Sequence, residues 1–256
     1  MPYPCYMIDN FLQMTQHVMP LCLSVSFIYT VSILTQTIVI EKELRLKEVM
    51  KIMGLSNSVH MLAWFITYFI QFSTIMAIVT SVLHFGNILT HSNPFLVFCL
   101  LEVFAVATIC FSFLVSSLYS KAKLAAACAG ILYFLSYVPC MYISIKEDVA
   151  LEIVPWWTKA LASLLSTSAF GLASKYIAFY EMDGMGLQWH NMNVSPLEND
   201  EFNCLESVKI MIFDCFLYWV IAWYIENVNP SYGIPLPITF PFRPSYWLGK
   251  DWIKSK

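Results

Sequence analysis

Long apolar stretches alternate with short polar ones along most of this chain. Five of them approach the roughly 20 residues that a helix needs to cross the hydrocarbon core of a bilayer. They cover about 19 to 40, 59 to 83, 95 to 118, 124 to 145 and 210 to 228. The second has no Asp, Glu, Lys or Arg from Val59 to Leu83, which is too long for an ordinary buried helix of a soluble domain. The pattern predicts an all-α polytopic membrane protein with five transmembrane helices.

The stretch 149–180 fits neither a loop nor a span. It contains two apolar pieces, each shorter than a crossing helix, which include Glu152, Lys159 and Lys175 and are interrupted at Pro155. Two short helices that enter the outer leaflet and return would satisfy their backbones internally. One irregular amphipathic segment on the membrane surface is the alternative, because the Trp and Tyr residues of the stretch suit an interfacial depth in either case.

Composition supports the membrane interpretation and removes other classes. Hydrophobic residues make up 59% of the 256 and charged residues only 12%, whereas soluble proteins carry about 25% charged residues. The 14 Lys and Arg nearly balance the 17 Asp and Glu, so the broad basic field that nucleic acid requires is missing. The eight cysteines form no CxxC motif, and neither His84 with His91 nor any Cys/His pair has metal-ligand spacing. We expect membrane lipids as partners, no nucleic acid and no metal site.

The distribution of positive charge predicts which side each loop occupies. The loops at about 41–58, 119–123 and 229–256 hold ten of the Lys and Arg residues, and the longer set at about 1–18, 84–94 and 146–209 holds four. Cytoplasmic loops carry the excess of positive charge. We therefore expect an exoplasmic N-terminal lead-in over 1–18 and a cytoplasmic C-terminal segment over 229–256.

A charged segment at 41–53 joins the first two predicted spans. Glu41 and Arg45 lie four residues apart with the acid first, as do Glu43 and Lys47, which is the favourable order on a helix, and Gly54 can end the helix. The segment predicts a short cytoplasmic helix. It could be a docking surface for a cytosolic partner or an interfacial helix that only turns the chain around.

Two acidic residues lie inside predicted spans. Glu102 is about eight residues from the outer end of its helix, where a headgroup contact or a tolerated local charge competes with a substrate site. For Asp214 we expect a structural polar contact, with Lys209 one turn earlier within reach. Asn193, in the sequence Asn-Val-Ser, is a candidate N-glycosylation site in a loop assigned to the outside.

Several motifs, taken in order, resemble the A-subfamily of ABC transporters over essentially the whole chain. They are Met1-Pro-Tyr-Pro-Cys5, Glu41-Lys-Glu-Leu-Arg-Leu-Lys-Glu48 with Met53-Gly-Leu55, Ser120-Lys-Ala-Lys-Leu-Ala-Ala-Ala127, Ser163-Leu-Leu165 with Ala169-Phe-Gly171, Gly184-Met-Gly-Leu-Gln-Trp189, Trp223-Tyr-Ile-Glu226 and Ser245-Tyr-Trp-Leu-Gly249. No single motif is specific, but the agreement of all of them in order is.

The resemblance implies a place within a larger lipid transporter. Family members have two transmembrane halves of six helices, each followed by a cytosolic ATPase domain, with a fold similar to type II ABC exporters. This chain resembles helices two to six of the first half, and its stretch 149–180 resembles the family's exoplasmic helical hairpin. The resemblance makes 41–53 a coupling helix against the ATPase domain, with Glu43, Arg45, Lys47 and Glu48 as candidate contacts.

The sequence contains neither a G-x-x-x-x-G-K-[ST] loop nor an LSGGQ-like signature. We therefore expect no catalytic or cofactor-binding residue in this chain, and ATP and Mg²⁺ would bind in nucleotide-binding domains of the parent transporter. Two rival classes stay open. One is a stand-alone membrane protein that binds or regulates a full transporter, and the other is a small channel or carrier, against which the lack of a ring-forming motif or a repeated half counts.

Overall fold

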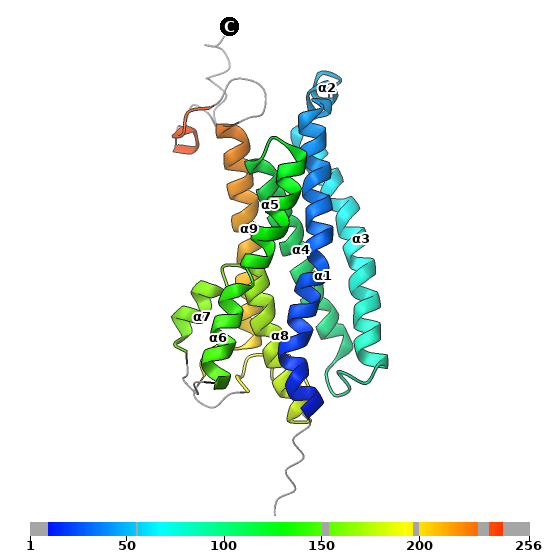
Figure 1. Cartoon of the computed structure of the whole chain (residues 1–256), viewed down its shortest axis with the longest axis vertical. Coiled ribbons are helices and arrows are strands. Elements are labelled where there is room, and N and C mark those ends of the chain that lie inside the picture. The colour runs from blue at the N-terminus through cyan, green and yellow to red at the C-terminus, as the bar shows by residue number, and fades with distance from the viewer. Residues whose placement is uncertain (1–9, 55, 150–153, 197–199, 230–235, 243–256) are drawn as a thin grey trace, which may run out of the picture.

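The computed structural model of the chain describes residues 10–54, 56–149, 154–196, 200–229 and 236–242 (Figure 1). Within these residues the regular elements are all helices. They are α1 (Asn10–Glu43), α2 (Leu46–Ile52), α3 (Asn57–Phe85), α4 (Pro94–Leu118), α5 (Ala122–Leu135), α6 (Val138–Val149), α7 (Trp156–Ala162), α8 (Ser166–Met182), α9 (Cys204–Val228) and the 3₁₀ turn η1 (Phe240–Phe242).

Five helical segments are long and apolar enough to cross a membrane. They are Val18–Glu43, Val59–Phe85, Pro94–Leu118, Ala122–Glu147 and Cys204–Val228. These positions match the five spans expected from the hydropathy pattern, and the prediction of an all-α protein with five candidate transmembrane helices is confirmed. Figure 1 shows the five running along the long axis, with α2 at one end of the bundle and the α3–α4 loop at the other.

Two helices begin earlier than hydropathy indicated. The first, α1, starts at Asn10, within the expected lead-in over 1–18, and α9 starts at Cys204 rather than near residue 210. Asn203 explains the start of α9, because its side-chain oxygen accepts a hydrogen bond of 2.9 Å from the backbone N–H of Glu206 and so caps the helix. A polar first turn lowers hydropathy without preventing a helix.

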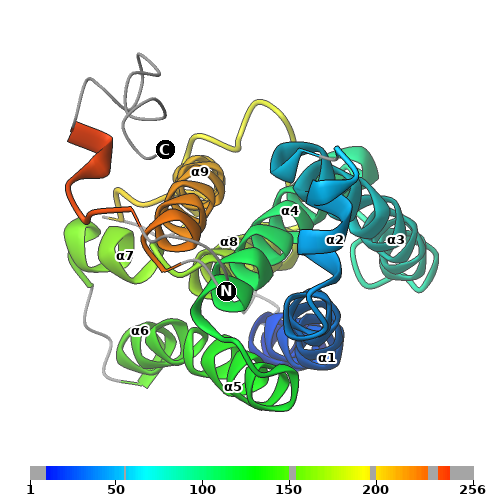
Figure 2. The same cartoon turned by 90° about the horizontal axis from the view of Figure 1, so that it is seen from above.

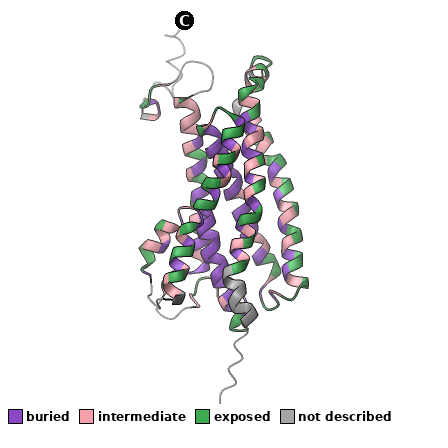
Figure 3. Cartoon of the chain, viewed as in Figure 1, coloured by how far each residue is buried: buried purple, intermediate pink, exposed green. Residues whose placement is uncertain are grey.

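The helix α4 lies near the centre of the bundle when it is viewed from above (Figure 2). It packs against α1, α3 and α9, and most of its side chains are buried. By contrast, α3 lies at the edge, where it exposes many large apolar side chains (Figure 3): Val59, Leu62, Ile66, Ile70, Ile78, Val82 and Phe85. Such a face is stable against lipid or against another apolar helix rather than against water.

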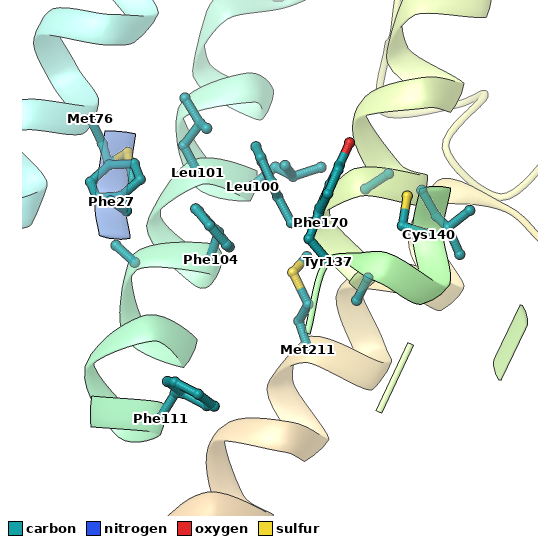
Figure 4. Packing of buried hydrophobic residues seen from close by; sticks show 14 of the residues in the cluster. Phe27, Met76, Leu100, Leu101, Phe104, Phe111, Tyr137, Cys140, Phe170 and Met211 are labelled. Atoms are coloured by element: carbon teal, nitrogen blue, oxygen red, sulfur yellow. The ribbon is translucent and has the colours of Figure 1, made fainter. Parts of the chain in front are cut away.

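Aromatic side chains hold the centre of the bundle together. Phe104 of α4 stacks on Phe170 of α8 with their ring centroids 4.0 Å apart, and Phe27 of α1 stacks on Phe72 of α3 at 5.4 Å. Phe27 also meets Phe104 edge-on at 5.9 Å. Figure 4 shows part of this cluster. Four helices, α1, α3, α4 and α8, are therefore joined by one group of rings.

A break divides the fourth span into α5 and α6. Pro139 has no N–H to donate to the carbonyl of the preceding turn, which interrupts the helical hydrogen bonds here. The next carbonyl, that of Ser136, also lacks its helical donor, because the N–H of Cys140 donates to Tyr137 at 3.1 Å. It accepts a hydrogen bond of 2.6 Å from Ser168 Oγ of α8. The break thus creates an acceptor that fixes the beginning of α8 partway along the span.

The helices α7 and α8 form a hairpin whose turn lies deep in the bundle. The hydroxyl of Tyr218 on α9 accepts from the backbone N–H of Ser166 at 3.2 Å and donates to the carbonyl of Leu164 at 3.1 Å. Tyr218 lies about 21 Å along α9 from Cys204 at 1.5 Å per residue. Nearly all of α8 is buried, so the alternative of one amphipathic segment on the surface is wrong.

Gly171 allows this hairpin to approach α6. A Cβ atom at Gly171 would lie only 2.5 Å from Cys140 Sγ and 3.0 Å from a ring carbon of Tyr137. Small residues let transmembrane helices pack closely in this way. The close packing of the hairpin against α6 therefore requires glycine at position 171.

Candidate functional site

Charged side chains of three helices gather at the end of the bundle that carries α2. Lys42 of α1 donates a hydrogen bond of 2.7 Å to the carbonyl of Ser116 near the end of α4, and its Nζ lies 3.8 Å from Glu226 Oε1 of α9. Lys47 of α2 reaches the same carboxylate oxygen at 3.2 Å. One acidic group on α9 therefore gathers two cations from α1 and α2.

Two further carboxylates of α1 connect it to α3 and α5. Glu41 accepts a hydrogen bond of 2.9 Å from the indole N–H of Trp64, and His60 Nε2 lies 3.1 Å from the same oxygen. Glu43 accepts from the backbone N–H of Ala122, the first residue of α5, at 3.0 Å. We call Glu41, Lys42, Glu43, Lys47 and Glu226 the charged junction. It connects α1 and α2 to the same ends of α3, α4, α5 and α9.

The segment predicted as one helix over 41–53 differs from that expectation. The first span continues to Glu43, the backbone bends at Leu44 and Arg45, and α2 covers only Leu46–Ile52. Arg45 has a φ of +58°, which a continuous α-helix does not contain. Gly54 has a φ of +98°, a conformation that glycine adopts without strain, and it follows the last turn as the sequence indicated.

The candidate contacts of this segment divide into two groups. Glu43 and Lys47 bind other helices of the bundle, as described above. Arg45 is exposed and Glu48 is partly exposed on α2. The apolar side chains of α2, which are not among the candidate contacts, are exposed as well: Leu46 45%, Val49 50%, Ile52 86% and the adjoining Met53 74%.

The two acidic residues inside spans have no hydrogen-bond partner among the described residues. Both carboxylate oxygens of Glu102 on α4 are buried and unpartnered, and so are those of Asp214 on α9. Lys209 does not reach Asp214: its ammonium pairs with Glu206 at 2.8 Å, and its side chain is 56% exposed. The expected Lys209–Asp214 contact is therefore wrong. The two residues are five positions apart on α9, which is more than one helical turn, so they point in different directions from the helix axis.

A buried ion network lies at the other half of the bundle, between the hairpin and its neighbours. Lys159 of α7 is fully buried, with its Nζ 2.5 Å from Glu147 Oε1 of α6 and 2.6 Å from Asp200 Oδ2. Lys175 of α8 binds the second oxygen of Glu147 at 3.0 Å. Tyr176 donates to Asp200 at 2.8 Å. Two cations thus balance two carboxylates, and Asp200 accepts a further hydrogen bond of 3.0 Å from the backbone N–H of Phe202. Buried charges require such partners.

Glu181, at the end of α8, holds the α3–α4 loop. Its two oxygens accept hydrogen bonds from the backbone N–H groups of His91 at 2.7 Å and Ser92 at 3.1 Å, and from the hydroxyls of Ser92 and Thr90. Burial acts to raise the pKa of Glu181, but the hydrogen bonds from His91, Ser92 and Thr90 outweigh it and hold that pKa below its ordinary value. We call Glu181 with Thr90, His91 and Ser92 the Glu181 clamp. The sequence did not predict it.

The candidate glycosylation site lies in a loop at the same end as this clamp. The Asn193 residue is exposed. Its backbone carbonyl accepts from the side chain of Asn203 at 3.1 Å, and Tyr180 donates to the carbonyls of Asn191 and Val194. The loop backbone is therefore fixed on both sides while residue 193 itself stays accessible.

The described residues contain no group of three or more His, Cys, Asp or Glu side chains that could hold a metal ion. His84 and His91 also have separate environments, since His91 Nδ1 lies 3.1 Å from Glu181 while His84 Nδ1 has no partner among these residues. The thiol of Cys204 is buried and unbridged, and Cys5 lies outside the described residues.

Comparison with known proteins places this geometry in a family. Residues 9–224 match the family model described as "ABC-2 family transporter protein". The chain belongs to this ABC-2 transporter family. Within it, the chain is 54% identical over 249 residues to "ATP-binding cassette sub-family A member 2" of Rattus norvegicus, a match that covers 97% of this chain and 10% of the relative.

Two further relatives carry a substrate class in their names. The ABC-2 family chain is 44% identical over 257 residues to "Retinal-specific phospholipid-transporting ATPase ABCA4" of Mus musculus, covering 100% of this chain and 11% of that protein. It is 42% identical over 256 residues to "Phospholipid-transporting ATPase ABCA7" of Homo sapiens, covering 100% of this chain and 12% of that protein. The resemblance to the A-subfamily is thereby confirmed, and the chain spans about a tenth of the length of these relatives.

Proposed function

We propose that this chain is the transmembrane portion of an ATP-driven lipid transporter, corresponding to helices two to six of the first half. Relatives that are named as phospholipid-transporting ATPases match the whole chain and support this substrate class. Nucleotide and Mg²⁺ binding are assigned to domains outside this chain. Its partners would then be membrane lipids, a nucleotide-binding domain and a second transmembrane half.

The observation that carries this proposal is the charged junction next to α2. A domain that pushes on α2 moves Lys47 and, through Glu226, the end of α9. Because α2 follows α1 after a short bend, the same push acts through Glu43 on α5, through Lys42 on α4 and through Glu41 on α3. The junction thus distributes one displacement among all five spans, which is what coupling to an ATPase requires.

The exposed apolar side chains of α2 are the proposed contact with the nucleotide-binding domain. Val49 is half exposed and projects from the junction together with Leu46 and Ile52. Arg45 and Glu48 flank them as polar contacts at the rim. This arrangement of an apolar centre and a charged rim is typical of protein interfaces.

A lipid-movement assay tests the proposal. The chain would be co-expressed with the nucleotide-binding domain and second half of a relative, reconstituted in vesicles, and assayed for ATP-dependent movement of labelled phospholipid. We expect Val49→Asp to abolish movement, because it places a charge in the apolar contact. Val194→Asp, at a similarly exposed valine at the other end of the bundle, should leave it intact. ATP-independent movement by the chain alone would contradict the proposal, as would equal effects of both variants.

The orientation is a separate part of the proposal. Charge bias supports a cytoplasmic α2 end, which puts the Asn193 loop on the exoplasmic or lumenal side. The Asn193→Gln substitution should then abolish an endoglycosidase-sensitive mass shift. A glycan acquired by an acceptor site engineered beside Lys123 would overturn the orientation.

A further inference from the structure

A segment that follows α9 folds back against the end of that helix. We call residues 236–242, which include η1, the strap. The backbone N–H of Leu236 donates a hydrogen bond of 3.1 Å to the carbonyl of Asn227, and the hydroxyl of Tyr224 donates one of 3.0 Å to the carbonyl of Ile238. The strap therefore runs back along α9, in the direction opposite to that of the helix.

One aromatic side chain fixes the strap to α9. Phe240 is 1% exposed, and its ring centroid lies 5.3 Å from that of Trp223 and 5.8 Å from that of Tyr224. The ring planes of Phe240 and Tyr224 are 13° apart, so these two rings stack. Pro237 and Pro241 restrict the backbone on either side of Phe240, which reduces the conformational entropy that docking costs. The strap is therefore suited to hold one conformation against α9.

The same part of α9 belongs to the charged junction. Glu226 lies between Tyr224 and Asn227 in the sequence, and its carboxylate is 3.2 Å from Lys47 of α2. Figures 1 and 2 show η1 beside α9, on the side away from α2. The end of α9 is therefore held from two sides, by α2 and by the strap.

The position of the strap contacts decides how a load reaches α9. The last four carbonyl groups of an α-helix have no intrahelical donor, so a load on the end of the helix acts on its weakest turn. The ring contacts at Trp223 and Tyr224 lie about 6 to 8 Å before Val228, at 1.5 Å per residue. A load that the strap carries therefore enters α9 within its hydrogen-bonded part and moves the helix as a unit.

We propose that the strap transmits movement of the chain that follows residue 242 to α9, at the level of Glu226 and independently of α2. Phe240 acts through its ring contacts with α9 and is a positioning residue. The inference rests on the proposed function, in which a nucleotide-binding domain follows this chain. The displacement of that domain then reaches α9 by two routes, and the second does not pass through Lys47.

Hydrogen exchange of the chain in lipid nanodiscs tests the docking. The backbone N–H groups of Leu236 and Phe240, which donate to the carbonyls of Asn227 and Pro237, should exchange slowly. Phe240→Ala should speed their exchange at least about fivefold, because it removes both ring contacts. The matched control is Ile238→Ala, whose side chain is 72% exposed, and it should leave the exchange unchanged. Fast exchange in the unsubstituted protein, or equal effects of the two variants, would overturn the proposal.

The lipid moved per ATP hydrolysed tests the transmission. The nucleotide-binding domain of a relative would be joined to this chain after Lys256 or supplied as a separate chain, with the second half present in both arrangements. In the joined arrangement Phe240→Ala should lower this ratio at least about threefold. In the separate arrangement it should leave the ratio unchanged, because no polypeptide connects the strap to the domain. Ile238→Ala should leave the ratio unchanged in both.

The two arrangements separate transmission from stability. A strap that only stabilises α9 would make Phe240→Ala lower the ratio equally in both, which would contradict the proposal, as would an unchanged ratio in the joined arrangement. Tyr224→Phe keeps the ring and removes one hydrogen bond, so it provides a milder variant that should lower the ratio about twofold in the joined arrangement alone. If the unsubstituted protein moves no lipid in either arrangement, the proposed function fails, whereas slow exchange of the strap would still show its docking.

Discussion

Glu43 of α1 caps a helix to which it does not belong. Its carboxylate accepts the backbone N–H of Ala122 at 3.0 Å, while the residue at the N-cap position of α5, Lys121, makes no side-chain cap hydrogen bond. An acidic group here also interacts favourably with the partial positive charge at the start of a helix. The first span therefore completes the fourth one, from 79 residues away.

This relationship predicts a stability loss on removal of the carboxylate. The Glu43→Ala substitution leaves the N–H of Ala122 without its acceptor, and we expect the free energy of unfolding to fall by about 1 kcal/mol. Thermal unfolding of the purified protein in detergent would measure this loss. Glu48→Ala is the control, because no side-chain hydrogen bond of Glu48 occurs within the described residues, and an equal loss there would contradict the capping role.

The buried ion network should be far more sensitive than a surface ion pair. Lys159→Met leaves Glu147 and Asp200 without their shared cation in the interior, and we expect a loss of about 3–5 kcal/mol. Lys209→Met removes an ammonium that is 56% exposed and pairs with a residue of its own helix, so its loss should stay below about 1 kcal/mol. Thermal unfolding compares the two. Similar losses would show that the Lys159 pairs are no stronger than surface contacts.

Asp214 should tolerate neutralisation. Because its buried oxygens have no hydrogen-bond partner among the described residues, replacing the carboxyl with an amide removes no contact, and we expect Asp214→Asn to change the free energy of unfolding by less than about 1 kcal/mol. Asp214→Leu should be neutral or stabilising for the same reason. Thermal unfolding checks both. A large loss in either variant would reveal an essential partner of the acid.

The Glu181 clamp predicts how the α3–α4 loop responds to acid. The folded pKa of Glu181 lies below its ordinary value, which is about 4.3 in unfolded chains. Its contribution to stability is therefore fully present above that ordinary pKa and is lost as the pH falls through the folded pKa. Hydrogen exchange over 86–93 should stay protected at about pH 5 and lose protection below about pH 4.

A neutral variant supplies the control for this pH dependence. The Glu181→Gln substitution should expose the loop to exchange at neutral pH and remove the step below about pH 4. Protection of α9 serves as an internal reference. A loss of loop protection well above about pH 5 in the unsubstituted protein would contradict the role of Glu181.

The sequence predicts the spans because each depends only on local composition. Val59 to Leu83 is apolar for a whole crossing length, and α3 occupies those positions. The sequence could not predict that Glu43 binds Ala122 or that Glu181 binds Ser92, because these contacts join residues that are 79 and 89 positions apart. For Lys159 a signal did exist: a cation within a short apolar piece must find a counter-charge if it is buried. The signal gave no identity for the partner.

The predicted start of α2 was wrong for a different reason. Charge spacing at Glu41, Glu43, Arg45 and Lys47 supports a helix at every step, and local rules contain nothing that would break it. In the folded chain Glu43 and Lys47 are drawn to Ala122 and Glu226, on different helices. Tertiary contacts of this kind override propensity, and the left-handed conformation of Arg45 lies between them.

The α7–α8 hairpin makes one half of the bundle wider than the other, as measured across the long axis of the bundle. From the break before α6 to the α3–α4 loop, α7 and α8 lie beside the five spans, whereas toward α2 the spans stand without them (Figure 1). In a bilayer that the five spans cross, the half of the bundle with α7 and α8 would displace more lipid than the half with α2. A bilayer around it relieves this mismatch by curving toward the narrow side, so the curvature of the host membrane enters the free energy of embedding this chain.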